Sequence, residues 1–229
     1  MFCVISGSYP QIPALERLGF EVLRVPPNRS VDTPVSDHAD IQLCRIGNTV
    51  FVAAEQPALA DAIRRRGYRV RMLRQQLCGI YPGDCLLECA VVGHCAVLHP
   101  GAVAPEVQEY VQQQGYLIVP VRQGYARCAV LPVGTDMVVT ADPGIAAALR
   151  QIGIELLLIR PGGISLPGYD TGFIGGCGGM PDPHTLIVSG DLRQHPDYEQ
   201  IHTVLQQRQI TLYCLPGPLT DVGGLLFFC

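Results

Sequence analysis

The stretch Arg65-Arg66-Gly67-Tyr68-Arg69-Val70 contains a pattern that recurs along the chain: a helix end, a glycine, an aromatic or β-branched residue, and a strand-like run. Copies with the same order surround Gly19, Gly115 and Gly153, and a further copy at 207–212 has lost the glycine. Glycine adopts the left-handed conformation just past a helix at little cost, so each copy marks a helix end. The copies indicate a chain built from repeats of one supersecondary unit.

Two strand-like runs joined by a tight turn precede four of these helices. The pairs are Ile41–Ile46 with Val50–Ala53, Leu86–Val92 with Ala96–Leu98, Cys128–Val133 with Met137–Thr140, and Gly172–Cys177 with Thr185–Ser189. Gly and Asn in short connections are typical of hairpins. The helices that follow are expected at 56–66, 104–114, 143–152 and 196–208, with Pro143 and Pro196 in first-turn positions. The unit is therefore β-β-α-β.

The two ends of the chain together make a fifth copy. Met1–Ser6, a helix near 11–18 and a strand near 20–25 form a unit without its first strand, and Leu225–Phe228 is a strand without the rest of its unit. We therefore expect an α/β fold, a five-bladed pseudo-symmetric propeller closed by the C-terminal strand, as a single domain over 1–229. Closure would hide the sheet edges. The alternative, a doubly wound sheet, would require strand–helix alternation without hairpins.

Composition excludes several functions. The chain has 229 residues, 48% hydrophobic and 16% charged, with a formal net charge of −4. Its cations, 16 by the Lys+Arg count, are all arginine, which excludes Schiff-base lysine chemistry, a pyridoxal-phosphate anchor and a lysine-dependent P-loop. The mildly acidic balance without a basic stripe argues against nucleic acid as a partner.

The cysteines are expected to be reduced thiols. There are 10 of them, but the N-terminus has no cationic segment followed by a long apolar one, as a signal peptide would. No apolar run approaches the length of a membrane span. We expect a cytoplasmic protein without a membrane partner, while the oligomeric state stays open.

Polar side chains precede or interrupt the innermost strand of each expected unit. The candidates for lining the centre of the ring are His38, Asp40, Glu88, Tyr125, Arg127, Tyr169, Asp170 and Asp221. Glu88 lies in an apolar run, where a carboxylate needs a partner or becomes neutral. In one interpretation these acids converge on a cationic or polyhydric ligand, with Arg127 as ion-pair partner or anion clamp. In the other, each Asp caps a turn and Glu88 pairs with Arg127 structurally.

Five β-β-α-β units in a closed ring resemble the pentein fold. That fold belongs to guanidino-group-modifying enzymes (arginine and agmatine deiminases, dimethylarginine hydrolase, amidinotransferases) and to the non-catalytic translation initiation factor six. Over essentially its whole length the chain also resembles an uncharacterised bacterial family assigned to the fold. The segments that carry this resemblance are His38-Ala39-Asp40, Arg122–Cys128, Gly168–Gly176, Gly190-Asp191 with His195-Pro196-Asp197, and Asp221–Gly224.

The resemblance to the catalytic penteins implies a cysteine nucleophile, a histidine in His-x-Asp, and acids that hold the guanidinium. The thiolate would attack the guanidinium carbon and the histidine would carry protons to the leaving amine. His38-Ala39-Asp40 has the His-x-Asp form, although in an earlier repeat than in the enzymes. Their nucleophile follows Gly-Gly-x-x near the C-terminus, and here Phe227 stands in that place.

Other thiols are candidates for the missing nucleophile. Cys177 follows two glycines, Cys89 lies beside Glu88, and Cys229 lies two residues beyond Phe227. We take Cys177, with His38 and Asp40, as the candidate catalytic set. For each cysteine the alternative is a buried structural thiol.

We expect no metal and no cofactor. Cys85, Cys89, His94, Cys95 and His99 lack the Cys-x2-Cys spacing of a zinc knuckle. The glycine-rich run at 172–179 is not followed directly by a helix, so it is no dinucleotide fingerprint, and close packing or a bound ligand explains it equally well. In the polar loop at 190–197, Asp191 and Asp197 are expected to cap turns or to contribute to the rim of a pocket.

The sequence thus predicts a pentein-like protein that binds or modifies a small guanidino- or amine-bearing molecule in a central acidic pocket. If it is an enzyme, it would be a hydrolase or transferase of the deiminase or amidinotransferase kind. The alternative is a non-catalytic, protein-binding propeller that resembles translation initiation factor six.

Overall fold

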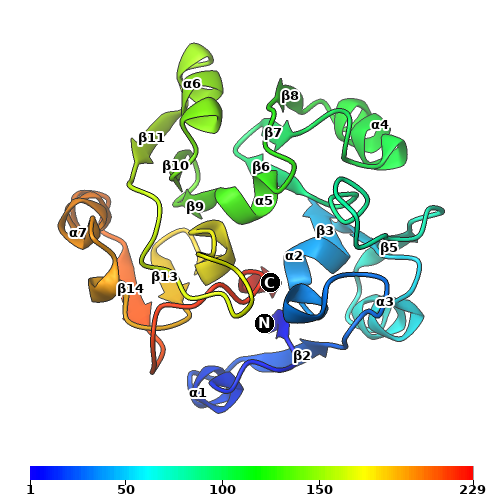
Figure 1. The fold of residues 1–229 in the computed structure, drawn as a ribbon, viewed down its shortest axis with the longest axis horizontal. Coiled ribbons are helices and arrows are strands. Elements are labelled where there is room, and N and C mark those ends of the chain that lie inside the picture. The colour runs from blue at the N-terminus through cyan, green and yellow to red at the C-terminus, as the bar shows by residue number, and fades with distance from the viewer. Residues whose placement is uncertain (229) are drawn as a thin grey trace.

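A computed structural model describes residues 1–228 of the chain. Within these residues the strands form five three-stranded sheets, which are arranged as blades around a common centre (Figure 1). The longer helices lie at the periphery of the ring, whereas the short helices α2 (Ala39–Gln42) and α5 (Ala126–Ala129) lie near its middle. The predicted five-bladed α/β propeller is therefore confirmed.

Four of the five blades contain a hairpin, a helix and a strand that returns parallel to the middle strand. The first has β3 (Leu43–Ile46), β4 (Thr49–Val52), α3 (Pro57–Arg64) and β5 (Arg69–Met72), and the second has β6 (Cys89–Val92), β7 (Cys95–Leu98), α4 (Pro105–Gln113) and β8 (Leu117–Pro120). The third has β9 (Leu131–Val133), β10 (Met137–Thr140), α6 (Pro143–Gln151) and β11 (Glu155–Leu158), and the fourth has β12 (Gly178–Asp182), β13 (Thr185–Val188), α7 (Tyr198–Gln207) and β14 (Thr211–Cys214).

Burial of the strands follows their place in the blade. The middle strands β4, β7 and β10 are buried at every residue, because the inner strand and the outer strand flank them and the helices cover them. The outer strand β5 alternates between more exposed and less exposed residues, as expected for a sheet edge with one packed face, and the outer strand β8 is exposed at both of its ends. Apolar middle strands therefore form the core, and the inner strands and the turns before them face the centre.

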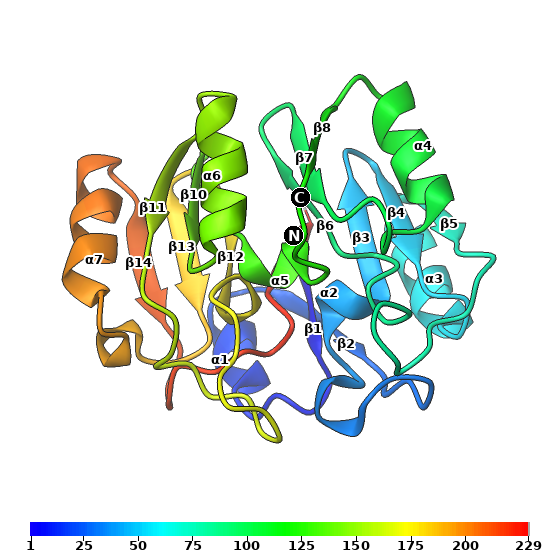
Figure 2. The ribbon, with the colours of Figure 1, turned by 45° about the horizontal axis from the view of Figure 1, so that its top comes forward.

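The two ends of the chain close the ring. Strand β15 (Leu226–Phe228) pairs antiparallel with β1 (Phe2–Ser6), which pairs parallel with β2 (Glu21–Val25) after helix α1 (Ile12–Arg17). Phe2 lies opposite Phe228, and their rings stack with centroids 4.6 Å apart. Figure 2 shows β1 running through the middle of the molecule between the other blades. Pairing the first strand with the last removes two sheet edges that would otherwise be unpaired.

The inner strands begin later than the sequence predicted, and the strand predicted at Gly172–Cys177 is wrong, because β12 spans Gly178–Asp182 and includes Pro181 and Asp182 of the expected turn. Residues 39–42 and 126–129 form helical turns instead of the beginnings of strands, the strand expected from Leu86 begins only at Cys89, and residues 175–177 form a 3-10 turn before β12. These segments carry the polar groups at the centre of the ring. A helical turn directs several of its backbone N–H groups and side chains to the same side of the segment. The predicted boundaries were wrong here because apolar residues in such turns are buried as completely as in strands.

The last helix also begins later than predicted. It starts at Tyr198, so Pro196 precedes it instead of standing in its first turn, whereas Pro57, Pro105 and Pro143 do begin their helices. A 3-10 turn, Leu192–Gln194, lies between β13 and this helix. Among the described residues no helix has the length and apolar character needed to cross a membrane.

Candidate functional site

A cavity of about 320 Å³ opens at the centre of the ring. Its walls come from the turn before β3, from helix α5 and the residue before it, from the segment before β12 and from the segment before β15. The lining residues are Val35, His38, Ile41, Tyr125, Cys128, Leu166, Tyr169, Asp170, Thr171, Phe173 and Asp221. Five residues predicted from the sequence line this cavity: His38, Tyr125, Tyr169, Asp170 and Asp221.

The thiol of Cys128 contacts two buried carboxyl groups at the inner end of this cavity. Its Sγ lies 3.0 Å from Asp40 Oδ2 and 3.0 Å from Glu88 Oε1. Neither acid is exposed to solvent. The other oxygen of Glu88 accepts hydrogen bonds from the backbone N–H groups of Arg127 and Cys128 at 2.8 and 3.2 Å, whereas Asp40 Oδ1 has no hydrogen-bond partner among the described residues. We call Asp40, Glu88 and Cys128 the thiol–carboxyl cluster.

The environment of the thiol–carboxyl cluster opposes ionisation. Burial, followed by the charge of Asp40, raises the pKa of Glu88 well above its usual range. Burial also raises the pKa of Cys128 well above that of a free thiol, and the nearby Asp40 and Glu88 add to this shift. Burial and the nearby carboxyl groups therefore favour the protonated forms of Glu88 and Cys128.

Asp221 and His38 form a second acidic element beside the cluster. The Asp221 carboxylate accepts hydrogen bonds from the N–H groups of Phe173 (2.8 Å) and Gly223 (3.0 Å). His38 Nδ1 lies 3.8 Å from Asp221 Oδ1. Burial raises the pKa of Asp221 to about 6, although the charge of His38 acts in the opposite direction.

Close packing explains the glycine-rich run, in which Gly172 and Gly176 pack against Asp221 and the other glycines approach the backbone of neighbouring segments. A Cβ atom added to Gly172 or Gly176 would overlap the side chain of Asp221. The carbonyl of Gly176 also accepts hydrogen bonds from Val222 and Gly224, both at 2.9 Å. The run at 172–176 therefore holds the carboxyl group of Asp221 in place.

Aromatic side chains form the outer wall of the central cavity. The hydroxyl of Tyr125 donates to Asp84 Oδ2 at 2.5 Å, and burial together with Asp84 raises the pKa of this tyrosine. Tyr169 is about half exposed and donates to Asp32 Oδ2 at 2.7 Å. The rings of Tyr125 and Phe173 lie 6.1 Å apart. These rings give the cavity an apolar wall opposite its acids.

Arg127 does not form an ion pair with Glu88 within residues 1–228. Its backbone N–H binds Glu88, but its guanidinium donates to the carbonyl oxygens of Val130 (3.4 Å) and Gly175 (3.5 Å). The side chain lines a separate cavity of about 210 Å³ on the other side of α5, together with residues of β3, β12 and β15. The expected ion pair between the Arg127 side chain and Glu88 is therefore not found among the described residues, and Arg127 contacts this carboxyl group only through its backbone N–H.

Two of the thiols nominated from the sequence, Cys177 and Cys89, lie outside the lining of the central cavity. Cys177 is fully buried, donates to the carbonyl of Phe173 at 3.2 Å, and has a pKa raised well above its usual value by burial. Cys89 also has a raised pKa, chiefly through its contact with Cys44 and through burial. Phe227 is buried in the closing strand, and Cys229 lies outside the described residues.

The thiol that does line the cavity, Cys128, was interpreted from the sequence as a small hydrophobic residue in a strand. Its only sequence signal was its position next to Arg127 in a polar stretch. Its partners Asp40 and Glu88 lie 88 and 40 residues away along the chain, so only the fold brings them together.

The thiol–carboxyl cluster also has the donor set for a metal ion. Among the described residues it is the one group of three His, Cys, Asp or Glu donors close enough together, with ligand atoms within 4.8 Å of one another. The cysteines and histidines at 85–99 form no such group within residues 1–228. The same oxygen and sulfur atoms are also suited to binding protons or an organic cation.

The sequence matches the model of the family of unknown function DUF6873 over residues 5–226. The chain belongs to this family. No curated protein matches the chain by sequence.

Solved structures of guanidino-modifying enzymes share the fold of this family member. An amidinotransferase of Microseira wollei from saxitoxin biosynthesis is 13% identical, with 90% of this chain and 72% of that chain covered and a TM-score of 0.54. Inosamine-phosphate amidinotransferase from Streptomyces griseus is 14% identical, with 89% and 72% covered and a TM-score of 0.56. The dimethylarginine hydrolase of Pseudomonas aeruginosa is 10% identical, with 89% and 78% covered and a TM-score of 0.55. The chain therefore has the pentein fold.

The burial of Cys128 predicts the pattern of thiol modification in the native protein. Iodoacetamide at neutral pH should modify the exposed Cys78 and Cys214, and leave Cys89, Cys128 and Cys177 unmodified until the protein is unfolded. Peptide mapping by mass spectrometry measures this directly. Modification of Cys128 as fast as Cys78 would show that its thiol is ionised and open to solvent, contrary to the structure.

Proposed function

We propose that the central cavity binds a small organic cation that carries a guanidino or amino group. The observation that supports this is the convergence of Asp40, Glu88 and Asp221 around Cys128, since within residues 1–228 no arginine side chain forms an ion pair with any of the three. Buried carboxylates without a cationic partner are costly, and of these three acids only Asp221 forms an ion pair, with His38, among the described residues; a cationic ligand would therefore stabilise the charged form of the others.

The shape and polarity of the cavity agree with such a ligand. Asp221 and the thiol–carboxyl cluster lie at its inner end, and Asp170 lies at its exposed rim. Tyr125, Tyr169 and Phe173 line the same space and offer aromatic faces, which attract cations. A planar guanidinium could contact the acids with its edge and an aromatic ring with its face.

The position of Cys128 adds a possible reaction to this binding. The relatives of known structure include amidinotransferases and a dimethylarginine hydrolase. A cation beside Cys128 would favour loss of its proton to a carboxylate of the cluster, since opposite charge stabilises a thiolate. The thiolate could then form a bond to the guanidinium carbon, and an amine would leave with a proton from His38.

The second candidate is binding without catalysis. It is favoured by Phe227 in the place where the catalytic relatives are expected to carry their thiol, and by the raised pKa values of Cys128 and Cys177. In this case the chain would act as a binding propeller.

Thermal unfolding with matched ligands tests the proposed binding. Butylguanidine, agmatine or arginine should raise the melting temperature, and butylurea, the neutral counterpart of butylguanidine, should not. Because the cation prefers ionised Asp221, whose pKa is about 6, butylguanidine should bind about tenfold more tightly at pH 7 than at pH 5. Asp221→Asn should weaken binding and remove most of this pH dependence.

The outcomes separate the proposals. Equal stabilisation by butylguanidine and butylurea, or an unchanged affinity in Asp221→Asn, would contradict cation binding in this cavity. Release of an amine or urea from a guanidino compound by the native protein, lost in Cys128→Ser while butylguanidine still binds, would support catalysis. Binding without any product, in wild type and Cys128→Ser alike, would favour the non-catalytic alternative.

A further inference from the structure

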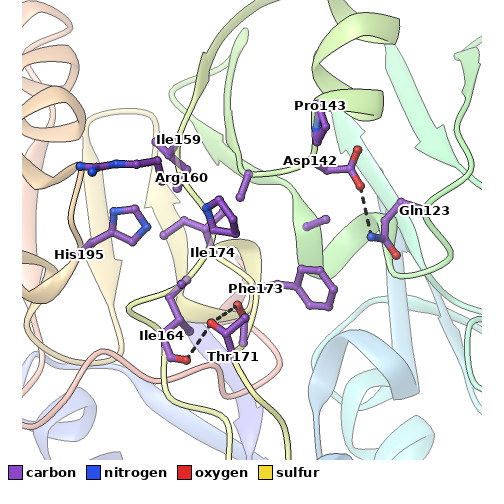
Figure 3. Close-up of a pocket in the computed structure, with 15 residues that line it drawn as sticks. Gln123, Asp142, Pro143, Ile159, Arg160, Ile164, Thr171, Phe173, Ile174 and His195 are labelled. Carbon is purple, nitrogen blue, oxygen red and sulfur yellow. Dashed lines mark hydrogen bonds between the residues drawn. The ribbon is translucent and has the colours of Figure 1, made fainter.

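A second cavity, of about 250 Å³, lies between the third and fourth blades. Its walls come from the start of helix α6, the segment that follows β11, the segment before β12 and the loop before α7. Most of the lining is apolar, including Ile159, Ile164, Ile174 and Phe173. Figure 3 shows His195 and Arg160 on one side of this cavity and Asp142 and Gln123 on the opposite side.

His195 contributes a buried hydrogen-bond donor without a partner. The side chain is 2% exposed, and its Nδ1 accepts a hydrogen bond from the backbone N–H of Asp197 at 3.0 Å. In the neutral ring the proton therefore sits on Nε2. Burial lowers the pKa of His195, which favours this neutral form. Among the described residues Nε2 has no hydrogen-bond partner.

The other polar groups of this cavity are already bonded. Asp142 caps α6 by accepting from the N–H of Ile145 at 2.9 Å, and its second oxygen accepts from Gln123 at 3.2 Å. The hydroxyl of Thr171 contacts the carbonyls of Ile164 and Gly172. Their hydrogen-bonding capacity is used within the protein, in contrast to that of His195.

The rim beside His195 is rigid and close to neutral. The guanidinium of Arg160 donates to Asp197 Oδ1 at 2.8 Å through Nε and to the carbonyl of Pro196 through Nη2, and its backbone N–H also binds Asp197. The ion pair balances the charge of the two residues and joins the segment after β11 to the His195-Pro196-Asp197 loop. Asp197 accepts hydrogen bonds from Arg160 and donates its backbone N–H to His195, and these bonds orient the imidazole ring.

A buried hydrogen-bond donor without an acceptor destabilises the folded protein. His195 projects from its loop toward the middle of the cavity (Figure 3), where apolar side chains surround an open space. We propose that this cavity is a second binding site, which takes a small branched apolar molecule through a carboxamide or carboxylate oxygen that accepts from His195 Nε2. The oxygen would satisfy the donor, and Ile159, Ile164 and Ile174 would contact the apolar part.

This site differs from the central cavity in the chemistry of its ligand. The two cavities share only Thr171 and Phe173, which form part of the wall of each. The central cavity presents acids to a cation, whereas this one presents a neutral donor within an apolar lining. Its ligand therefore does not depend on the function proposed for the centre.

Titration of the full chain with isovaleramide and isovalerate, followed by NMR of isoleucine methyl groups, tests the proposal. Either probe should shift the methyl resonances of Ile159, Ile164 and Ile174 saturably, while those of Ile5 and Ile63 in other blades stay unchanged. Isoamylamine has the same branched chain but no acceptor oxygen. Because it is a cation that also suits the central cavity, its binding is measured at these three isoleucines in Asp221→Asn protein, where it should be about five- to tenfold weaker than that of isovaleramide.

Two variants locate the effect. His195→Asn retains an acceptor for the Asp197 N–H, as in an Asx turn, but removes the Nε2 donor. It should weaken isovaleramide binding about five- to tenfold. Ala141→Leu should fill the cavity and abolish binding, and His184→Asn, at an exposed histidine of the β12–β13 turn, should change nothing.

Three results would overturn the proposal: no saturable shift with either probe, equal affinity of His195→Asn and wild type, or equal affinity for isovaleramide and isoamylamine. A loss of binding in Ala141→Leu with a preserved methyl spectrum supports the location even if His195→Asn is poorly folded. Retention of binding in a folded Ala141→Leu protein would place the probe elsewhere and reject the site.

Discussion

Replacing Glu88 with alanine is expected to lower the free energy of unfolding by about 3 kcal/mol, because two buried N–H donors lose their acceptor. The Glu88 carboxyl accepts from the backbone N–H groups of Arg127 and Cys128 and contacts the Cys128 thiol. These groups are buried at the centre of the ring, so water does not replace the lost hydrogen bonds. Urea denaturation of wild type and Glu88→Ala at pH 7 measures the difference.

Glu88→Gln is the matched control for this prediction. Glutamine retains an oxygen that can accept from the two N–H groups, and it is uncharged, like the protonated form of Glu88 that the raised pKa of this carboxyl group favours. We expect Glu88→Gln to stay within about 1 kcal/mol of wild type. If Glu88→Ala proved as stable as Glu88→Gln, the carboxyl group would not be needed as a hydrogen-bond acceptor at the centre.

Replacing Gly176 with alanine is the second change with a large expected effect. The added Cβ would overlap the carboxyl group of Asp221, which is buried and bonded to Phe173 and Gly223 and therefore has no room to move. Overpacking of this kind costs about 3 kcal/mol at its upper range. We expect a loss of stability of that size in urea denaturation, and a loss of butylguanidine binding, since Asp221 must shift.

Gly144→Ala is the comparison for Gly176→Ala. Gly144 lies in helix α6, and a Cβ there would meet only Asp142 Oδ1, at 3.1 Å. The gain in helix propensity, about 1 kcal/mol, offsets this contact, so a small net change is expected. A Gly176→Ala protein as stable as Gly144→Ala would mean that the segment at 172–176 yields easily and does not hold Asp221.

The blades could be predicted because their signals are local. The glycines at 67, 115 and 153 all have positive φ in the structure, as the helix-end pattern requires. The hairpins depend on turn residues within a few positions of the strands that they join. The closing strand could be predicted because an unpaired copy stands at each end of the chain.

The boundaries of the inner strands could not be predicted. Residues 39–42, 126–129 and 175–177 are mostly buried and mix apolar or small residues with a few polar ones such as Asp40, Gln42 and Arg127, so their composition fits a strand as well as a turn. Their helical conformation depends on contacts from other blades, such as the bond from the Asp40 N–H to the Gly223 carbonyl. A pattern within one segment does not contain this information.

The sequence by itself determined the number of blades, their order of elements and the closure of the ring, because turn chemistry and apolar periodicity act over a few residues. It also indicated that the centre is acidic, since polar residues recur at the start of each inner strand. Only the tertiary structure decided which groups meet there: Cys128 with Asp40 and Glu88, Asp221 with His38, and Arg127 turned toward backbone carbonyls. These contacts join residues from different blades, and their hydrogen bonds and pKa shifts depend on distances that arise only when the ring closes.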